Sequence, residues 1–241
     1  MKIKTLLLFL LFTSNSAFAT LNENPIILQQ IQLANQCNQN STIESNCHMF
    51  LNTRASYNLY NKNYDEAFKD WNLALKINPK YATVYYNRAL YYFENNETIN
   101  ALNDINNSIL YTNQNKIMDL SIMYNLRGLM QKEIGDYKGA MDDFSKSILL
   151  NSNGENAYYN RGVLKQELKN FQEAINDYTM SIKIRPKNPD AFLHRGIILI
   201  ENGKKEMGLK DLGYAKEQYA QENNIDGYRK SVQLMNKLNK R

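Results

Sequence analysis

A repeat of about 34 residues is the feature that most constrains this chain. The period runs from His48 to Glu222 and is interrupted once, by the short insertion Lys116–Leu120. The repeated units align without internal gaps and span 48–81, 82–115, 121–154, 155–188 and 189–222. A repeat of this length is typical of stacked supersecondary units, which bury their apolar sides against their neighbours. We therefore expect an array of five similar units.

Small and large residues recur at fixed places in every unit. In the first half of each unit, a large residue at Leu51, Tyr85, Tyr124, Tyr158 and Phe192 is followed by a small one at Ala55, Ala89, Gly128, Gly162 and Gly196. In the second half, small residues at Ala67, Ala101, Ala140, Ala174 and Gly208 precede large ones at Trp71, Ile105, Phe144, Tyr178 and Leu212. Two antiparallel helices approach closely only where one of them carries a small side chain and a bulky neighbouring side chain fills the adjoining groove. The pattern therefore predicts two packed helices per unit.

These positions resemble the tetratricopeptide repeat. Tyr158-Tyr159-Asn160-Arg161-Gly162 and Lys169-Asn170-Phe171-Gln172-Glu173-Ala174 are similar to standard members of that family. The resemblance covers roughly three quarters of the chain that would follow an export signal. It implies an all-α fold, a right-handed superhelical solenoid of about five helix-turn-helix units with capping helices at both ends.

Each unit also carries one Arg and one Asp that we expect to pair. The arginines are Arg54, Arg88, Arg127, Arg161 and Arg195, and the aspartates are Asp70, Asp104, Asp143, Asp177 and Asp211. The Arg precedes the expected turn by about as many residues as the Asp follows it. The two side chains should therefore lie at the same level in the two helices. Because the pair recurs in every unit, we interpret it as a structural ladder rather than as an anion-binding row. Such a ladder fixes register more than it adds stability.

The N-terminus has the pattern of a secretory signal peptide over 1–19. Met1-Lys2-Ile3-Lys4 is followed by the apolar stretch Thr5–Phe12 and by Ala17-Phe18-Ala19, an A-x-A cleavage site. The apolar stretch is much shorter than the roughly 20 residues that span a membrane. We therefore expect an exported chain that begins near Thr20 and is not inserted in a membrane.

Cys37 and Cys47 are the only cysteines and both precede the repeats. In an oxidising compartment, an isolated pair this close in sequence is most simply one disulfide. A catalytic thiol is the weaker alternative, because the pair lacks C-x-x-C spacing and an evident activating partner. The segment 20–47 is expected to hold a capping helix, starting at Asn24-Pro25, and the disulfide loop. A second capping helix is expected within 223–241.

Composition disfavours several other classes of function. The formal charge of +5 becomes +3 without Lys2 and Lys4, and the remaining charges are mixed, so nothing indicates a nucleic-acid partner. The only histidines are His48 and His194, and the chain contains no phosphate-binding glycine motif. We therefore expect no metal, no cofactor and no enzymatic activity. Gly and Pro are scarce and no Gly/Ser linker is present, which favours one elongated helical unit.

The resemblance implies that the first helices line a groove that binds a peptide or protein. Projected onto this sequence, the binding positions are Tyr86, Leu90, Phe93, Glu94, Asn125, Leu129, Glu133, Tyr159, Val163, Glu167, Ile197 and Glu201. The acidic row Glu94, Glu133, Glu167 and Glu201 would favour a segment that carries Lys or Arg. The alternative is that individual floor residues only pack between neighbouring helices. As function, we expect a scaffold or adaptor in a bacterial envelope, most simply the periplasm, with a secreted protein that acts on host or extracellular partners as the alternative.

Overall fold

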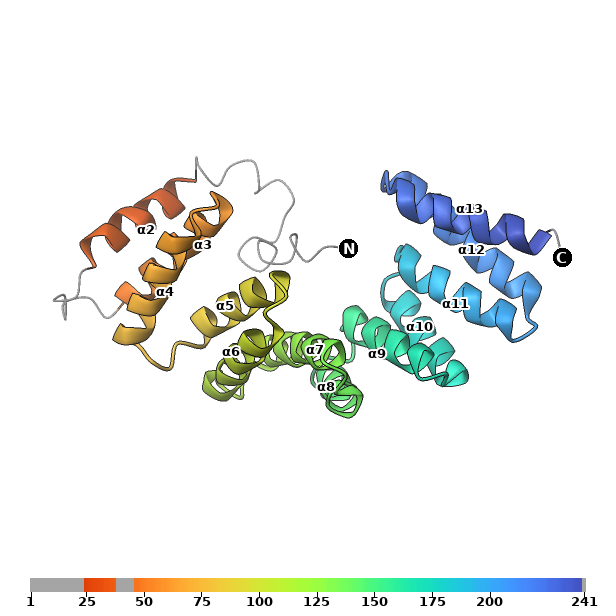
Figure 1. Ribbon diagram of the computed structural model, residues 1–241, viewed down its shortest axis with the longest axis horizontal. Helices are drawn as coiled ribbons and strands as arrows, with labels where there is room; N and C mark the ends of the chain where they lie inside the picture. The colour runs from red at the N-terminus through yellow and green to blue at the C-terminus, as the bar shows by residue number, and fades with distance from the viewer. Residues whose placement is uncertain (1–23, 38–45, 240–241) are drawn as a thin grey trace. The chain divides into compact units, whose positions relative to one another are not determined.

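The computed structural model describes residues 24–37 and 46–239, and within these residues every regular element is an α-helix (Figure 1). The chain divides into two compact units, one ending at Lys116 and one starting at Ile117, where the sequence had suggested a single helical unit. The N-terminal unit contains α2 (Pro25–Gln36), α3 (Cys47–Tyr60), α4 (Tyr64–Ile77), α5 (Ala82–Glu94) and α6 (Thr98–Tyr111). The C-terminal unit contains α7 (Ile117–Glu133), α8 (Tyr137–Leu150), α9 (Glu155–Glu167), α10 (Phe171–Ile184), α11 (Pro189–Glu201), α12 (Lys205–Gln221) and α13 (Ile225–Asn239).

Each of the five sequence repeats forms one helical hairpin. The pairs α3/α4 and α5/α6 lie in the N-terminal unit, and α7/α8, α9/α10 and α11/α12 lie in the C-terminal unit. The insertion between the second and third repeats is not a loop, because Ile117–Leu120 forms the first turn of α7. This extra turn makes α7 longer than the first helices of the other repeats.

Every hairpin turn contains one residue with left-handed backbone at the same place in the repeat. These residues are Lys62, Asn96, Gly135, Lys169 and Gly203, with φ between 62° and 82°. The next residue then donates its amide to a carbonyl five positions back, as Asn63 does to Asn58 and Asn170 does to Lys165, both at 2.8 Å. This 6→1 bond belongs to the Schellman motif, which ends a helix and turns the chain back. The turn is therefore fixed by backbone geometry even where the residue is not Gly.

The core of each hairpin is built from the alternating small and large residues. Trp71, Phe144 and Tyr178 are fully buried, as are the alanines that precede them in the second helices. A methyl group on Gly128 would lie 2.7 Å from the Phe144 ring, and one on Gly162 would lie 3.0 Å from the Tyr178 ring. The rings therefore fill the space that a side chain on these glycines would need.

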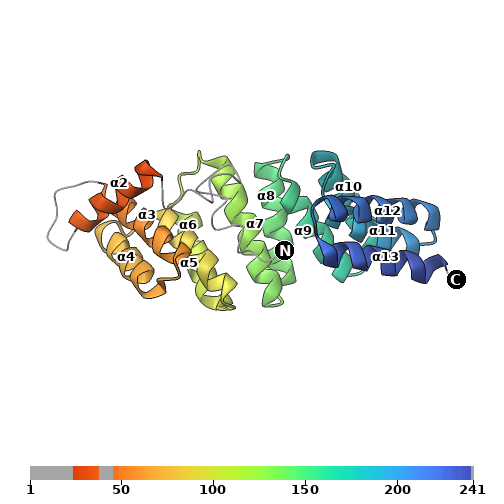
Figure 2. The ribbon, with the colours of Figure 1, turned by 90° about the horizontal axis from the view of Figure 1, so that it is seen from above.

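The helices at the two ends of the chain pack on the outermost hairpins. Asn24 caps α2 through its side chain, Pro25 is the first helical residue, and the helix packs on α3. At the other end α13 lies beside α12, as both ribbon views show (Figure 2), and Leu234 and Met235 pack against the core cluster that includes Tyr219.

A search of residues 24–37 and 46–239 for a helix with the length and apolar character of a membrane span found none. The predicted signal peptide over 1–19 and the expected start near Thr20 lie outside the described residues.

Candidate interaction surface

The structure brings all five Arg and Asp pairs together. In every rung, Nε and one terminal nitrogen of the Arg donate to the two carboxylate oxygens of the Asp, at distances between 2.5 and 2.9 Å. The aspartates are buried, with 4 to 6% of their surface exposed. Bidentate pairing of a planar guanidinium with a carboxylate fixes both distance and orientation. Each rung therefore sets the register of its two helices.

In three of the rungs the remaining guanidinium nitrogen links two consecutive repeats of the same unit. It donates to a side chain that lies two residues after the ladder Asp of the preceding repeat. The described contacts are Arg88 to Asn72 (3.3 Å), Arg161 to Ser145 (3.0 Å) and Arg195 to Thr179 (3.1 Å). The spacing within one repeat predicts the first contact of the Arg but not this second one, which depends on how neighbouring hairpins stack.

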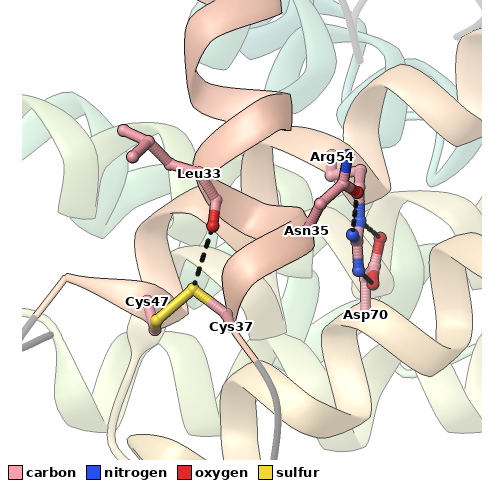
Figure 3. Close-up of a disulfide and its surroundings, with 6 residues drawn as sticks. All are labelled: Leu33, Asn35, Cys37, Cys47, Arg54 and Asp70. Carbon is pink, nitrogen blue, oxygen red and sulfur yellow. Dashed lines mark hydrogen bonds and ion pairs between the residues drawn. A yellow bond between two sulfur atoms is a disulfide. The ribbon is translucent and has the colours of Figure 1, made fainter. Parts of the chain in front are cut away.

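In the first rung a residue from α2 makes this contact. Arg54 donates to Asn35 at 2.6 Å, so α2 stands where the second helix of a preceding repeat would stand (Figure 3). The Cys37–Cys47 disulfide holds the end of α2 to the start of α3, with the Cα atoms 5.7 Å apart. Both cysteines are buried and belong to the core of the first hairpin. The disulfide thus fixes a helix that completes the ladder.

The projected binding residues of the N-terminal unit are largely covered. Tyr86 and Leu90 on α5 have only 6% and 1% of their surface exposed, and Phe93 and Glu94 are partly exposed. Tyr86 and Leu90 therefore belong to the packed interior of the hairpins. They present little area for a partner to contact.

The projected residues of the C-terminal unit are more accessible. They lie on α7, α9 and α11, the first helices of its three hairpins, and we call the surface formed by these helices the first-helix face. Asn125, Leu129, Tyr159, Val163 and Ile197 are partly exposed, and Glu133, Glu167 and Glu201 are exposed. This face therefore offers aromatic, aliphatic and acidic side chains together.

Two contacts across this face place α7 and α9 side by side. The Asn160 amide donates to the Asn125 carbonyl oxygen at 3.0 Å, and Lys132 forms an ion pair with Glu167 at 2.6 Å. The second contact was not expected, because Lys132 was not counted as a partner of the acidic row. Its place in the last turn of α7, beside the end of α9, is the signal that could have indicated it. The ion pair neutralises part of the acidic row.

A polar and aromatic cluster lies at the middle of the first-helix face. The Gln166 carbonyl oxygen accepts from the Tyr178 hydroxyl at 2.7 Å and lies 3.0 Å from His194 Nδ1. The ring of Tyr159 is 6.0 Å from that of Tyr178 and 5.9 Å from that of His194. Burial lowers the pKa of His194 and raises the pKa of Tyr159 and of Tyr178. The imidazole is therefore neutral at pH 7.

A second network anchors one end of this cluster. Asp190, at the start of α11, accepts from the hydroxyl of Tyr219 on α12 at 2.5 Å. Glu155 accepts from Asn188 and from Ser181, the latter at 3.2 Å. These bonds join the start of α9, the end of α10 and the start of α11. Tyr159 lies on the next turn of α9 after Glu155.

The fold defines the class of protein, an all-α array of helical hairpins bound together by a repeated Arg and Asp ladder. Residues 155–188, the fourth repeat, match the family model for the tetratricopeptide repeat. The fourth repeat is therefore a tetratricopeptide repeat, and the array of hairpins has the fold of a tetratricopeptide-repeat solenoid. A search of curated proteins by sequence finds no match.

Solved structures with the same fold support this assignment. The MamA protein is 17% identical with a TM-score of 0.63, over 76% of this chain and 97% of that one. MamA from Desulfovibrio magneticus RS-1 is 11% identical with a TM-score of 0.62, over 72% and 96%. YrrB, described as a TPR protein with an unusual peptide-binding site, is 17% identical with a TM-score of 0.60, over 78% and 91%. At these identities the likeness concerns the fold.

Within residues 24–37 and 46–239, no three His, Cys, Asp or Glu side chains lie close enough together to hold a metal ion.

Proposed function

We propose that this protein is a non-catalytic scaffold of the bacterial cell envelope that binds a peptide or protein segment on the first-helix face of its C-terminal unit. The observation that carries the proposal is the combination on this face of partly exposed Tyr159, Val163 and Ile197 with the exposed carboxylates. Aromatic and aliphatic anchors surrounded by polar groups are typical of protein interfaces. YrrB, which shares the fold, has a peptide-binding site.

The charges on the face suggest the kind of segment that binds. Glu133 and Glu201 are exposed at the ends of α7 and α11, and Glu167 lies between them on α9. Lys132 pairs with Glu167 but faces no other carboxylate in the described contacts. The face is therefore acidic on balance, and a bound segment that carries Lys or Arg would associate faster and orient better than an acidic one.

Export supports the placement in the envelope. The signal-peptide pattern over 1–19 and the Cys37–Cys47 disulfide are both features of proteins that act outside the cytoplasm. Separation of the cells into cytoplasm, periplasm and medium, followed by N-terminal sequencing, tests this part. We expect a chain in the periplasm that begins near Thr20. A chain in the medium would favour the secreted alternative, and an uncleaved chain in the cytoplasm would refute export.

The binding face is tested by selecting peptides from a displayed random library on the mature, oxidised protein. Tyr159→Ala should abolish capture of the selected peptides because it removes the aromatic ring at the middle of the face. The matched control is Tyr137→Ala, which removes an equally large ring, 45% exposed, at the start of α8. Circular dichroism checks that both variants fold. Equal capture by the two variants would show that the face is assigned wrongly.

A further inference from the structure

The Gln166 and His194 side chains present an unused pair of hydrogen-bonding groups. The Gln166 carbonyl oxygen already accepts from Tyr178 and lies 3.0 Å from His194 Nδ1. A carbonyl oxygen only accepts, so Nδ1 of the neutral ring carries the proton and Nε2 is an acceptor. Neither Gln166 Nε2 nor His194 Nε2 has a hydrogen-bond partner among the described residues, and both side chains are partly exposed.

The remaining pair is therefore one donor and one acceptor. The Gln166 amide nitrogen donates and His194 Nε2 accepts. If the carboxamide were turned over, its nitrogen would donate to Tyr178 and to Nδ1, and its oxygen would be the unused group. His194 would then carry its proton on Nε2, so the unused pair would again be one acceptor and one donor. The complementarity of this pair does not depend on the orientation of the amide.

We propose that Gln166 and His194 form a subsite that binds an amide group of the partner, with Tyr159 packed beside it. An amide presents one acceptor and one donor in a fixed plane, which is the complement of the unused pair. This inference rests on the proposed function, since it names the chemical group that the first-helix face recognises. The amide belongs either to an Asn or Gln side chain or to the peptide main chain.

Protonation of His194 changes the ligand that this subsite prefers. In the imidazolium both ring nitrogens donate, so Nδ1 keeps its bond to the Gln166 oxygen and Nε2 becomes a second unused donor. Two donors fit a carboxylate rather than an amide. The charged and titratable groups that face the ring are Tyr159 and Glu167 of α9, Tyr178 of α10, Lys132 of α7, Lys230 of α13 and Asp190 of α11 itself. Burial and Lys230 both lower the pKa of His194, so the amide-binding form is the neutral-pH form.

Acetamide and acetate are the probes that test the subsite without a known partner. NMR signals of the Gln166 side-chain amide and the His194 ring are followed while each probe is titrated into the mature protein. Acetamide should shift these signals at about pH 7.5, where His194 is neutral, and acetate should shift them only as the pH is lowered and His194 takes up a proton. Gln166→Glu replaces the amide by an isosteric carboxylate and should abolish the acetamide response. The control is Gln172→Glu, the same change at an exposed position on α10. Absence of an acetamide response in the wild type, or an equal response in both variants, would overturn the proposal.

Selected peptides separate this inference from the proposed function. We consider a selected peptide that Tyr159→Ala no longer binds. Gln166→Glu should lower the affinity for this peptide about tenfold, since about 1.4 kcal/mol corresponds to a tenfold change in affinity. Replacing Asn or Gln of the peptide by Leu, and methylating its main-chain amides one at a time, shows whether the bound amide is in a side chain or in the main chain. If Tyr159→Ala abolishes binding and Gln166→Glu leaves it unchanged, the face binds peptides but the amide subsite is refuted.

Discussion

Replacing Gly208 by Ala tests whether the last hairpin depends on direct backbone contact between its helices. A methyl group on Gly208 of α12 would lie 2.6 Å from the carbonyl oxygen of Gly196 on α11. The backbone cannot move aside as a flexible side chain can, so the two helices must separate. Overpacking of this kind costs about 1–3 kcal/mol, and we take the upper half of that range. The gain in helix propensity from Gly to Ala returns about 1 kcal/mol.

The net expectation for Gly208→Ala is a loss of about 1–2 kcal/mol in the free energy of unfolding. Gly213 supplies a control in the same helix, because a methyl group there meets no atom within 4 Å. Gly213→Ala should therefore raise the stability by the propensity gain of about 1 kcal/mol. Urea denaturation of the oxidised protein, followed by far-ultraviolet circular dichroism, measures both. If Gly208→Ala were as stable as Gly213→Ala, the close approach would not be what requires Gly at 208.

Three further predictions follow from the ladder, the disulfide and the buried histidine. Asp177→Asn should cost about 1–3 kcal/mol in urea denaturation, because it leaves a partly buried guanidinium without its carboxylate; Glu66→Gln, which breaks an exposed ion pair, should have no measurable effect. Replacing both cysteines by Ser should lower the free energy of unfolding by about 2–3 kcal/mol for a loop of this length. Amide hydrogen exchange should become faster in α2 before it does so in other helices, and unchanged protection of α2 would contradict this. Because burial lowers the pKa of His194, the folded state takes up a proton less readily than the unfolded state. The contribution of His194 to the free energy of unfolding should be full above about pH 6.5 and fall as the pH drops towards the lowered pKa of the folded state. His194→Gln should flatten this part of the pH dependence of stability. His48 contributes to it with the same sign, because burial also lowers its pKa.

The sequence was sufficient to predict what repeats within a unit. The hairpins and the level placement of Arg and Asp follow from residues that recur at one spacing, such as Arg161 and Asp177. Position alone then determines the contact, because both partners lie on the same rigid hairpin. The pairing of Cys37 with Cys47 was simple to predict for another reason, since the described chain has no other cysteine.

What could not be predicted depends on how different hairpins meet. The pairing of Lys132 with Glu167 joins two repeats and occurs at one junction only, so no periodic pattern indicates it. The same holds for the bond between Asn35 and Arg54, which requires knowing that α2 packs as a second helix. The binding face therefore stays a prediction, whereas the structure confirms the hairpins that carry it.

The position of α2 has a consequence for the direction in which this protein comes apart. Arrays of repeats lose structure from their ends, because a terminal unit has one neighbour fewer than the others. Here the first helix that could detach is bound covalently to the next one through Cys37 and Cys47 and shares the first ladder rung. At the other end, α13 is held to α12 by side-chain packing alone in the described contacts. Unravelling under heat, force or protease attack should therefore proceed from the C-terminal end inward, and reducing conditions would open a second route from the N-terminal end.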